Sequence, residues 1–391
     1  MSNPTGSSNG PRGRVAPRSR VAQGAGLVAG VAALSVGSLA VGVELERRMV
    51  AKRVSRHAAL AIEPFFGLRA PGPEVVTPDG VHLHVEVDEV EPHASGRRTD
   101  DPTMPADSKD SSEAAGNPPT LVFVHGYVLS LHCWHFQRKH FRGTHRMVFY
   151  DQRSHGESGH SEPEHDRVSQ LSKDLQQVLE ATTEPDEKVV LIGHSMGGMT
   201  IQQFAADHPD LIGSKVVGVA LIATSSGELS NHSIIKGVPG VMFSRLAEPT
   251  LALSRRASGT VERARRASKD LAFVITRRMA FGSDVPVEYT EFMAEMIART
   301  PMTVVGDFYP AFAEFDGTKG LEVLQGTETA VIGGVQDAIT PIKHTDRIIE
   351  RLPGAESLRI NHSGHMGIIE HHDEINTVLD NLIERARREN R

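Results

Sequence analysis

The chain has 391 residues, a formal net charge of −7 and a single cysteine, Cys133. One cysteine excludes an intrachain disulfide and a cysteine-based zinc cluster. With 39% hydrophobic and 23% charged residues, the composition is ordinary for a globular enzyme, and a mildly acidic chain has no overall attraction to nucleic acid. We therefore expect a globular protein without a nucleic-acid partner.

Residues 1–56 differ from this composition. The first twenty residues hold four arginines and no acidic residue, and residues 21–43 hold no charge at all. A helix over this run would be long enough to cross a hydrocarbon layer of about 30 Å. The run predicts membrane association through residues 21–43, as a single-pass anchor or an export signal. The alternative is a helix that does not cross a membrane, in a cytoplasmic protein. Arginines and lysines flank both ends, so the orientation stays open.

The predicted catalytic domain begins after this segment and covers residues 57–225. Its first strand signal lies in residues 74–91, where residues 81–87 alternate apolar and polar side chains as a half-buried strand does. Residues 92–118 then become rich in Asp, Ser, Pro and Gly and predict a disordered insertion.

Short apolar runs follow and predict strands of a parallel sheet that is buried on both faces. The runs are residues 121–124, 147–150, 189–192, 216–223 and 330–332. Helical patterns over 171–181, 200–208 and 374–388 would supply helices around the sheet. The pattern is typical of an α/β fold with a doubly wound, mostly parallel sheet, whose second part is residues 326–391.

Between the two parts, residues 226–325 lack the strand pattern and are mostly helical in pattern. Residues 224–329 hold seven of the 14 phenylalanines and five of the 12 methionines of the chain. Because this insertion falls between late strands, where such sheets carry their active site, we expect a helical lid over an apolar pocket. A packed helical subdomain without a lid function is the alternative.

The strongest motif is Gly193-His194-Ser195-Met196-Gly197-Gly198, which follows a predicted strand and precedes a predicted helix. A nucleophilic serine on such a sharp turn needs small residues two positions before and after it. Ser195 is therefore the candidate nucleophile. A second match, around Ser8, lies in a polar tail without a strand or helix and is set aside.

The candidate oxyanion donors are two backbone N–H groups. Residues 121–124 run into His125-Gly126-Tyr127, and a glycine there lets the next N–H group face the pocket. The N–H groups of Tyr127 and Met196 would together stabilise an oxyanion. We expect His125 to hold this loop by hydrogen bonding.

Five ordered groups of residues resemble the α/β-hydrolase superfamily, in its lidded esterase, lipase and haloperoxidase-like branch. They are residues 123–126, 151–158, 193–198, 334–341 and 363–365, within a likeness that covers 74–225 and 326–391. The resemblance implies that Asp337 is the catalytic acid and His365 the base, and that Asp151, Arg153 and His155 brace a loop. Branches with an aspartate nucleophile do not match a serine at position 195.

The resemblance and the motifs together predict a serine hydrolase of the carboxylesterase or lipase type, which cleaves a small-molecule ester with an apolar acyl group through an acyl-enzyme. A lipid-like ester is one option. No cofactor or metal is expected. A thioesterase, a C–C hydrolase or a cofactor-free haloperoxidase would use the same three residues. A catalytically silent binding protein of this fold is the alternative from another class.

Overall fold

The computed structural model describes residues 63–91, 118–229 and 273–389. Three predicted segments therefore lie wholly or largely outside the described residues: residues 21–43, the insertion at 92–118 and the part of the lid at 230–272. Within the described ranges, no helix combines the length and apolar character that a membrane span requires. The membrane prediction for residues 21–43 stays a prediction.

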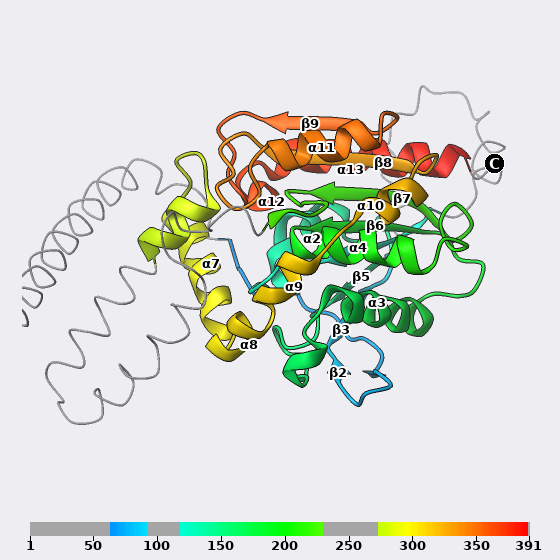
Figure 1. The fold of residues 1–391 in the computed structure, drawn as a ribbon, viewed down its shortest axis with the longest axis horizontal. Helices are drawn as coiled ribbons and strands as arrows, with labels where there is room; N and C mark the ends of the chain where they lie inside the picture. The colour runs from blue at the N-terminus through cyan, green and yellow to red at the C-terminus, as the bar shows by residue number, and fades with distance from the viewer. Residues whose placement is uncertain (1–62, 92–117, 230–272, 390–391) are drawn as a thin grey trace, which may run out of the picture. The chain divides into compact units, whose positions relative to one another are not determined.

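Seven strands form the central sheet, in the order β3-β5-β4-β6-β7-β8-β9 (Figure 1). β3 pairs with β5 in the antiparallel sense, and all other neighbours are parallel. This confirms the predicted mostly parallel sheet. The strands are β3 (Val85–Asp88), β4 (Thr120–Val124), β5 (Met147–Tyr150), β6 (Val189–His194), β7 (Val216–Ile222), β8 (Glu328–Gly334) and β9 (Glu356–Ile360).

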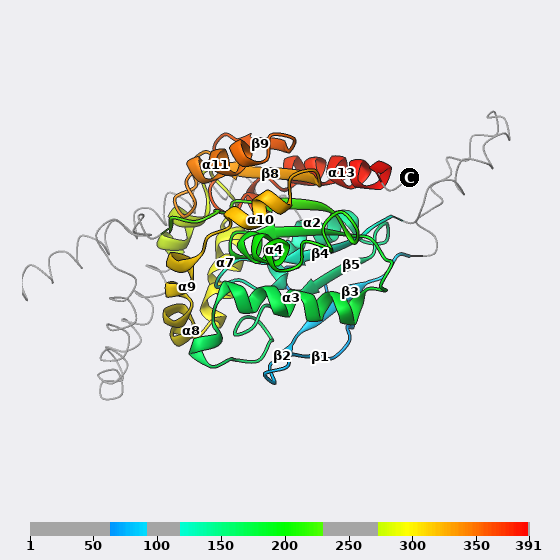
Figure 2. The same ribbon diagram turned by 45° about the vertical axis from the view of Figure 1, so that its right-hand side comes forward.

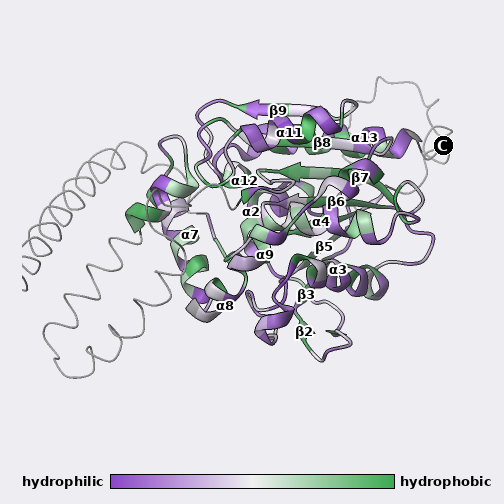
Figure 3. Ribbon diagram, in the orientation of Figure 1, coloured by the Kyte–Doolittle hydropathy of each residue, from purple (hydrophilic) through white to green (hydrophobic). Residues whose placement is uncertain are grey.

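Helices cover both faces of the sheet (Figures 1 and 2). Successive side chains of a strand point to opposite faces, so Leu121 and Phe123 of β4 join one core cluster and Val122 and Val124 join the other. The first cluster includes residues of α2 (His135–Phe141), α12 (Gly367–Glu370) and α13 (His372–Glu389). The second includes residues of α3 (Val168–Thr182), α4 (Met196–Asp207), α10 (Thr318–Val323) and α11 (Lys343–Arg351). Burial on both faces explains why the central strands are almost wholly apolar (Figure 3).

The structure differs from the sequence prediction at the two edges of the sheet. Residues 81–87 do not form one strand: β2 (His82–Leu83) pairs with β1 (Val75–Val76) in a separate two-stranded sheet, and β3 joins the main sheet. Alternation would expose Glu86, yet Glu86 is buried. β9 was not predicted, because this edge strand is polar and half exposed (Figure 3).

The predicted lid, residues 226–325, includes α7 (Val287–Arg299), α8 (Met302–Asp307) and α9 (Tyr309–Glu314), whereas α10, within the same bounds, packs in the second core cluster. Figure 1 shows α7, α8 and α9 on the side toward which β7 and β9 point. Phe308 and Phe312 pack in one cluster with Met196 and Met199 of α4. Residues of the predicted lid therefore pack against the start of α4, next to Ser195. Two short 3₁₀ helices, Leu131–Trp134 and Pro163–His165, lie in loops of the core.

Candidate active site

Ser195 lies between the end of β6 and the first residue of α4, at a turn with unusual backbone geometry. Its φ is 53° and its ψ is −117°, in a region that residues with a side chain rarely adopt. The Ser195 N–H group donates to the carbonyl of Ile222 at 2.9 Å, and the Ser195 carbonyl accepts from Thr224 Oγ1 at 2.7 Å. These two bonds hold the strained residue against β7.

The glycines around Ser195 are required by close packing. A Cβ atom on Gly197 would lie 2.0 Å from the carbonyl oxygen of Val124, at the end of the neighbouring strand. A Cβ atom on Gly193 would lie 2.7 Å from the Gly197 carbonyl carbon. Backbone atoms cannot move away as flexible side chains can, so this turn accepts only glycine at both positions.

The loop after β4 is fixed by His125. The Gln152 N–H group donates to His125 Nε2 at 2.9 Å, so the ring proton lies on Nδ1, which donates to the Gly126 carbonyl at 2.7 Å. Burial lowers the pKa of His125 to about 3, and the ring is neutral at pH 7. His125 therefore holds the loop rather than exchanging a proton.

Tyr127 and Met196, the predicted oxyanion donors, lie beside Ser195. Met196 is the first residue of α4, so its N–H group has no acceptor within the helix. The Tyr127 hydroxyl donates to the Val305 carbonyl of α8, and its ring packs against Phe312 of α9 at 5.0 Å between centroids. The loop that carries Tyr127 is thus joined to α8 and α9.

Asp337 and His365, the predicted acid and base, are hydrogen-bonded to each other. His365 Nδ1 lies 2.8 Å from Asp337 Oδ2, and both side chains are buried. The second carboxylate oxygen accepts the N–H groups of Ile339 at 2.8 Å and Thr340 at 2.9 Å, and Thr340 Oγ1 lies 2.8 Å from Oδ2. Burial pushes the pKa of Asp337 up, but His365 and these donors hold it below its usual value. Asp337 is therefore ionised, and His365 carries its proton on Nδ1.

Two polar residues next to this pair were not singled out by the sequence prediction. Thr340 Oγ1 lies 3.3 Å from His365 Nδ1 and 2.9 Å from the Ala223 carbonyl. His194, the residue before Ser195, has Nε2 2.9 Å from the His365 carbonyl. Burial lowers the pKa of His194 to about 3, so the ring is neutral. No sequence signal identifies these contacts, because they join segments that are far apart in the chain.

Ser195 opens onto a cavity of about 230 Å³ with mostly apolar walls. Residues of the predicted oxyanion loop, of α4, of α9 and of the loop after β8 surround it. The lining residues are Tyr127, Ser195, Met196, Met199, Leu229, Tyr309, Phe312, Ala313, Ile339 and Thr340. Asp337 is hydrogen-bonded to Thr340, which lines this cavity, and the His365 carbonyl lies 2.9 Å from Nε2 of His194, the residue before Ser195. The contact between the Ser195 hydroxyl and His365 stays a prediction.

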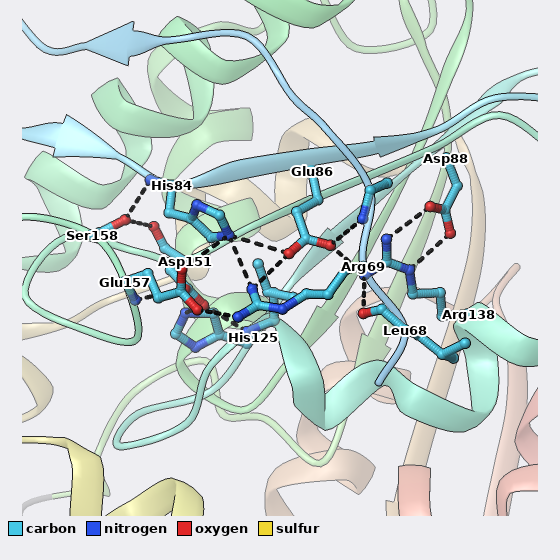
Figure 4. A network of polar contacts seen from close by, with 12 residues as sticks. Leu68, Arg69, His84, Glu86, Asp88, His125, Arg138, Asp151, Glu157 and Ser158 are labelled. Carbon is cyan, nitrogen blue, oxygen red and sulfur yellow. Dashed lines mark hydrogen bonds and ion pairs between the residues drawn. The ribbon is translucent and has the colours of Figure 1, made fainter. Parts of the chain in front are cut away.

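Asp151 braces the loop next to the cavity (Figure 4). Its carboxylate accepts the N–H group of Leu131 at 2.7 Å and that of Glu157 at 2.8 Å, and burial raises the pKa of Asp151 to about 6. The Arg153 guanidinium is also buried and donates to Asp174 through two nitrogens, at 2.6 and 2.7 Å. These contacts match the bracing role that the resemblance implied.

A buried charge network fixes the described segment that begins at residue 63 (Figure 4). Arg138 of α2 donates to both oxygens of Asp88 at 2.7 Å and to Glu86 at 2.6 Å. Glu86 also accepts from Arg69 at 2.8 Å and from the Ala70 N–H group at 3.0 Å. The buried glutamate in β3 is thus paired on two sides, which explains why it can lie inside.

The fold and the motifs agree with the comparison to protein families. The family model described as "alpha/beta hydrolase fold" matches residues 119–372. The chain belongs to the alpha/beta hydrolase fold family. Within the described ranges, no group of three His, Cys, Asp or Glu side chains is arranged to hold a metal ion.

Individual relatives of this hydrolase are distant. Methylesterase 7 of Arabidopsis thaliana is 23% identical over 67% of this chain and 95% of its own length. Epoxide hydrolase 1 of Caenorhabditis elegans is 31% identical, but the match covers only 24% of this chain and 23% of that relative. The solved structure of an esterase from Exiguobacterium antarcticum covers 80% of this chain and 100% of its own, with a TM-score of 0.59 and 15% identity. The structural likeness shows the shared fold, and the relatives agree with a hydrolase and leave the substrate open.

Proposed function

We propose that this protein is a serine hydrolase that cleaves an ester-type bond of a small apolar substrate through an acyl-enzyme. Ser195 is the nucleophile, His365 the general base and Asp337 the orienting acid. The observation that carries the proposal is the bond of 2.8 Å between the buried Asp337 and His365 side chains, beside the strained turn of Ser195. A carboxylesterase or lipase is the activity that fits best.

The reaction begins with the transfer of the Ser195 proton to His365. Because Nδ1 of His365 donates to Asp337, Nε2 is the nitrogen that accepts the proton. The Ser195 oxygen attacks the ester carbonyl carbon, and the oxyanion is stabilised by the N–H groups of Tyr127 and Met196. His365 then protonates the leaving alcohol. A water molecule, deprotonated by His365, releases the acid and restores Ser195.

The ionised Asp337 stabilises the imidazolium that forms in each step. Its carboxylate is held by the N–H groups of Ile339 and Thr340, so it cannot rotate away from His365 without losing two hydrogen bonds. The fixed carboxylate also holds the proton of the resting ring on Nδ1. Both effects favour transfer from Ser195 to Nε2.

The cavity supports an apolar acyl group as the substrate portion next to Ser195. Met199, Leu229, Phe312 and Ile339 supply apolar walls, and none of the described residues that line it is charged. Burying an acyl chain there gains about 0.8 kcal/mol for each methylene group. We therefore expect esters with an apolar acyl chain to react faster than acetate esters.

A fluorophosphonate probe tests the proposal because it reacts only with an activated serine. The native protein should take up one label, and Ser195→Ala should take up none while keeping its circular dichroism spectrum. A chain-length series of matched esters and thioesters then separates an esterase from a thioesterase. A folded native protein that takes up no label would contradict the proposal and favour a silent binding protein.

A further inference from the structure

Glu370, at the end of α12, accepts hydrogen bonds from two separate loops. Its Oε2 accepts the N–H group of Gly364, the residue before His365, at 2.7 Å. Both carboxylate oxygens lie near the N–H group of Gly282, at 3.0 and 3.1 Å, and Oε1 also accepts the N–H group of Ser283. Gly282 and Ser283 lie just before α7. One carboxylate thus joins the loop of His365 to the base of the lid.

The two loops also touch through their backbones. A Cβ atom on Gly364 would lie 2.6 Å from the Ala280 carbonyl oxygen, and one on Gly282 would lie 2.6 Å from the Ser363 carbonyl carbon. The Met366 N–H group donates to the Ala280 carbonyl at 2.8 Å. The segments approach so closely that a shift of one loop must move the other.

The same loop is held on its other side by the strand that leads to Asp337. The Gln336 N–H group donates to the Ser363 carbonyl at 2.9 Å. A Cβ atom on Gly334 would lie 2.5 Å from the Gly364 carbonyl oxygen. The backbone around His365 is therefore packed between the loop that carries Asp337 and the segment just before α7. The Glu370 carboxylate adds hydrogen bonds between the His365 loop and this segment.

We propose that Glu370 is a positioning residue, which sets the distance between His365 and Ser195 by holding the His365 loop against the base of the lid. This inference rests on the proposed function, because it assigns His365 as the base. A carboxylate suits the role because it only accepts hydrogen bonds, and all three of its partners are N–H donors. An amide would turn an NH₂ group toward at least one of these donors, which would push one loop away.

The variant Glu370→Gln tests this role, with Glu374→Gln as the matched control. Glu374 lies four residues later in α13, its side chain is 57% exposed and it bonds to the ring of His371. Both variants lose one negative charge. We expect kcat of Glu370→Gln on a p-nitrophenyl ester to fall about tenfold or more, because small misplacements of a catalytic group are costly. KM should stay within about twofold, because Glu370 does not line the cavity.

Hydrogen exchange gives a readout that does not depend on activity. In Glu370→Gln, peptides that contain Gly364 and peptides that contain Gly282 should exchange faster together, while peptides of β6 and α4 stay unchanged. Faster exchange along the whole chain would show a general loss of stability and overturn the positioning role. If Glu370→Gln does not fold, Glu370→Asp keeps the charge on a shorter side chain and should show the same two-loop change with a smaller loss of kcat.

The outcomes separate this inference from the proposed function. Equal kcat in Glu370→Gln and Glu374→Gln, both at the native level, would overturn the inference while leaving a serine hydrolase in place. A native protein that takes up no fluorophosphonate label would contradict the proposed function and the catalytic part of the inference. The exchange data would then still decide whether Glu370 joins the two loops, and unchanged exchange at Gly364 and Gly282 would contradict that joining as well.

Discussion

The substitution Asp337→Asn should remove activity while keeping the fold, and the hydrogen bonds around the carboxylate show why. Asp337 receives four donors: two N–H groups on Oδ1, and the Thr340 hydroxyl and His365 Nδ1 on Oδ2. An amide oxygen in the place of Oδ1 still accepts both N–H groups. Its NH₂ group then replaces Oδ2 and faces Thr340 and His365.

These two partners can adapt to the amide. The Thr340 hydroxyl can donate to the Ala223 carbonyl at 2.9 Å and accept from the NH₂ group. The His365 ring can accept on Nδ1, but only if its proton moves to Nε2. All four contacts remain, so the free energy of unfolding should change by less than about 1 kcal/mol. The ring, however, presents a proton to Ser195 where a base is needed.

The loss of kcat should be about 10⁴-fold, which corresponds to about 5.5 kcal/mol in the activation free energy. Hydrolysis of a p-nitrophenyl ester and urea unfolding measure the two quantities on the same preparation. Asp373→Asn is the matched control, since the Asp373 side chain is 93% exposed at the start of α13. Asp337→Asn with kcat within tenfold of the native value and unchanged stability would refute the assignment of Asp337.

Two further predictions concern the framework of the site. Arg138→Met should lower the free energy of unfolding by about 3–5 kcal/mol at pH 7, because Glu86 and Asp88 stay buried without their partner. In the native protein, burial raises the pKa of Glu86, but its hydrogen bonds outweigh this and lower the pKa overall. The pairing of Glu86 with Arg138 therefore stabilises the folded state at pH values above the usual glutamate pKa, and this stabilisation is lost as the pH falls below it. The deficit of the variant should be smaller at pH 4, below the usual glutamate pKa, than at pH 7 in urea unfolding, and equal deficits would contradict the buried pairing. Gly197→Ala should lower the free energy of unfolding by about 3 kcal/mol or prevent folding, because its Cβ atom would lie 2.0 Å from the Val124 carbonyl oxygen. Gly354→Ala is the control, since a Cβ atom there has open space around it, and its free energy of unfolding should change by less than about 0.5 kcal/mol. Similar melting temperatures for the two variants would show that the turn is not closely packed.

The sequence by itself determined the five buried strands β4 to β8 and the turn of Ser195. Strands buried on both faces must be apolar throughout, so the apolar run of residues 147–150 predicts β5 with the same bounds that the strand has in the fold. The turn after β6 is recognisable because its geometry excludes side chains at Gly193 and Gly197. These signals are local, since each depends on neighbouring residues along the chain.

Tertiary structure decided the contacts between segments that are far apart in the sequence. β9 escaped prediction because an edge strand needs no apolar run, and Glu86 lies inside only because Arg138 and Arg69 come from other segments to pair with it. The bonds from His194 to the His365 carbonyl and from Glu370 to Gly282 and Gly364 likewise join separate loops. A single sequence carries no pattern for such pairs, because any backbone carbonyl or N–H group can serve as the partner. The motif around Ser195 and the resemblance to a known family predicted the candidate triad, and the fold alone decided which groups surround it.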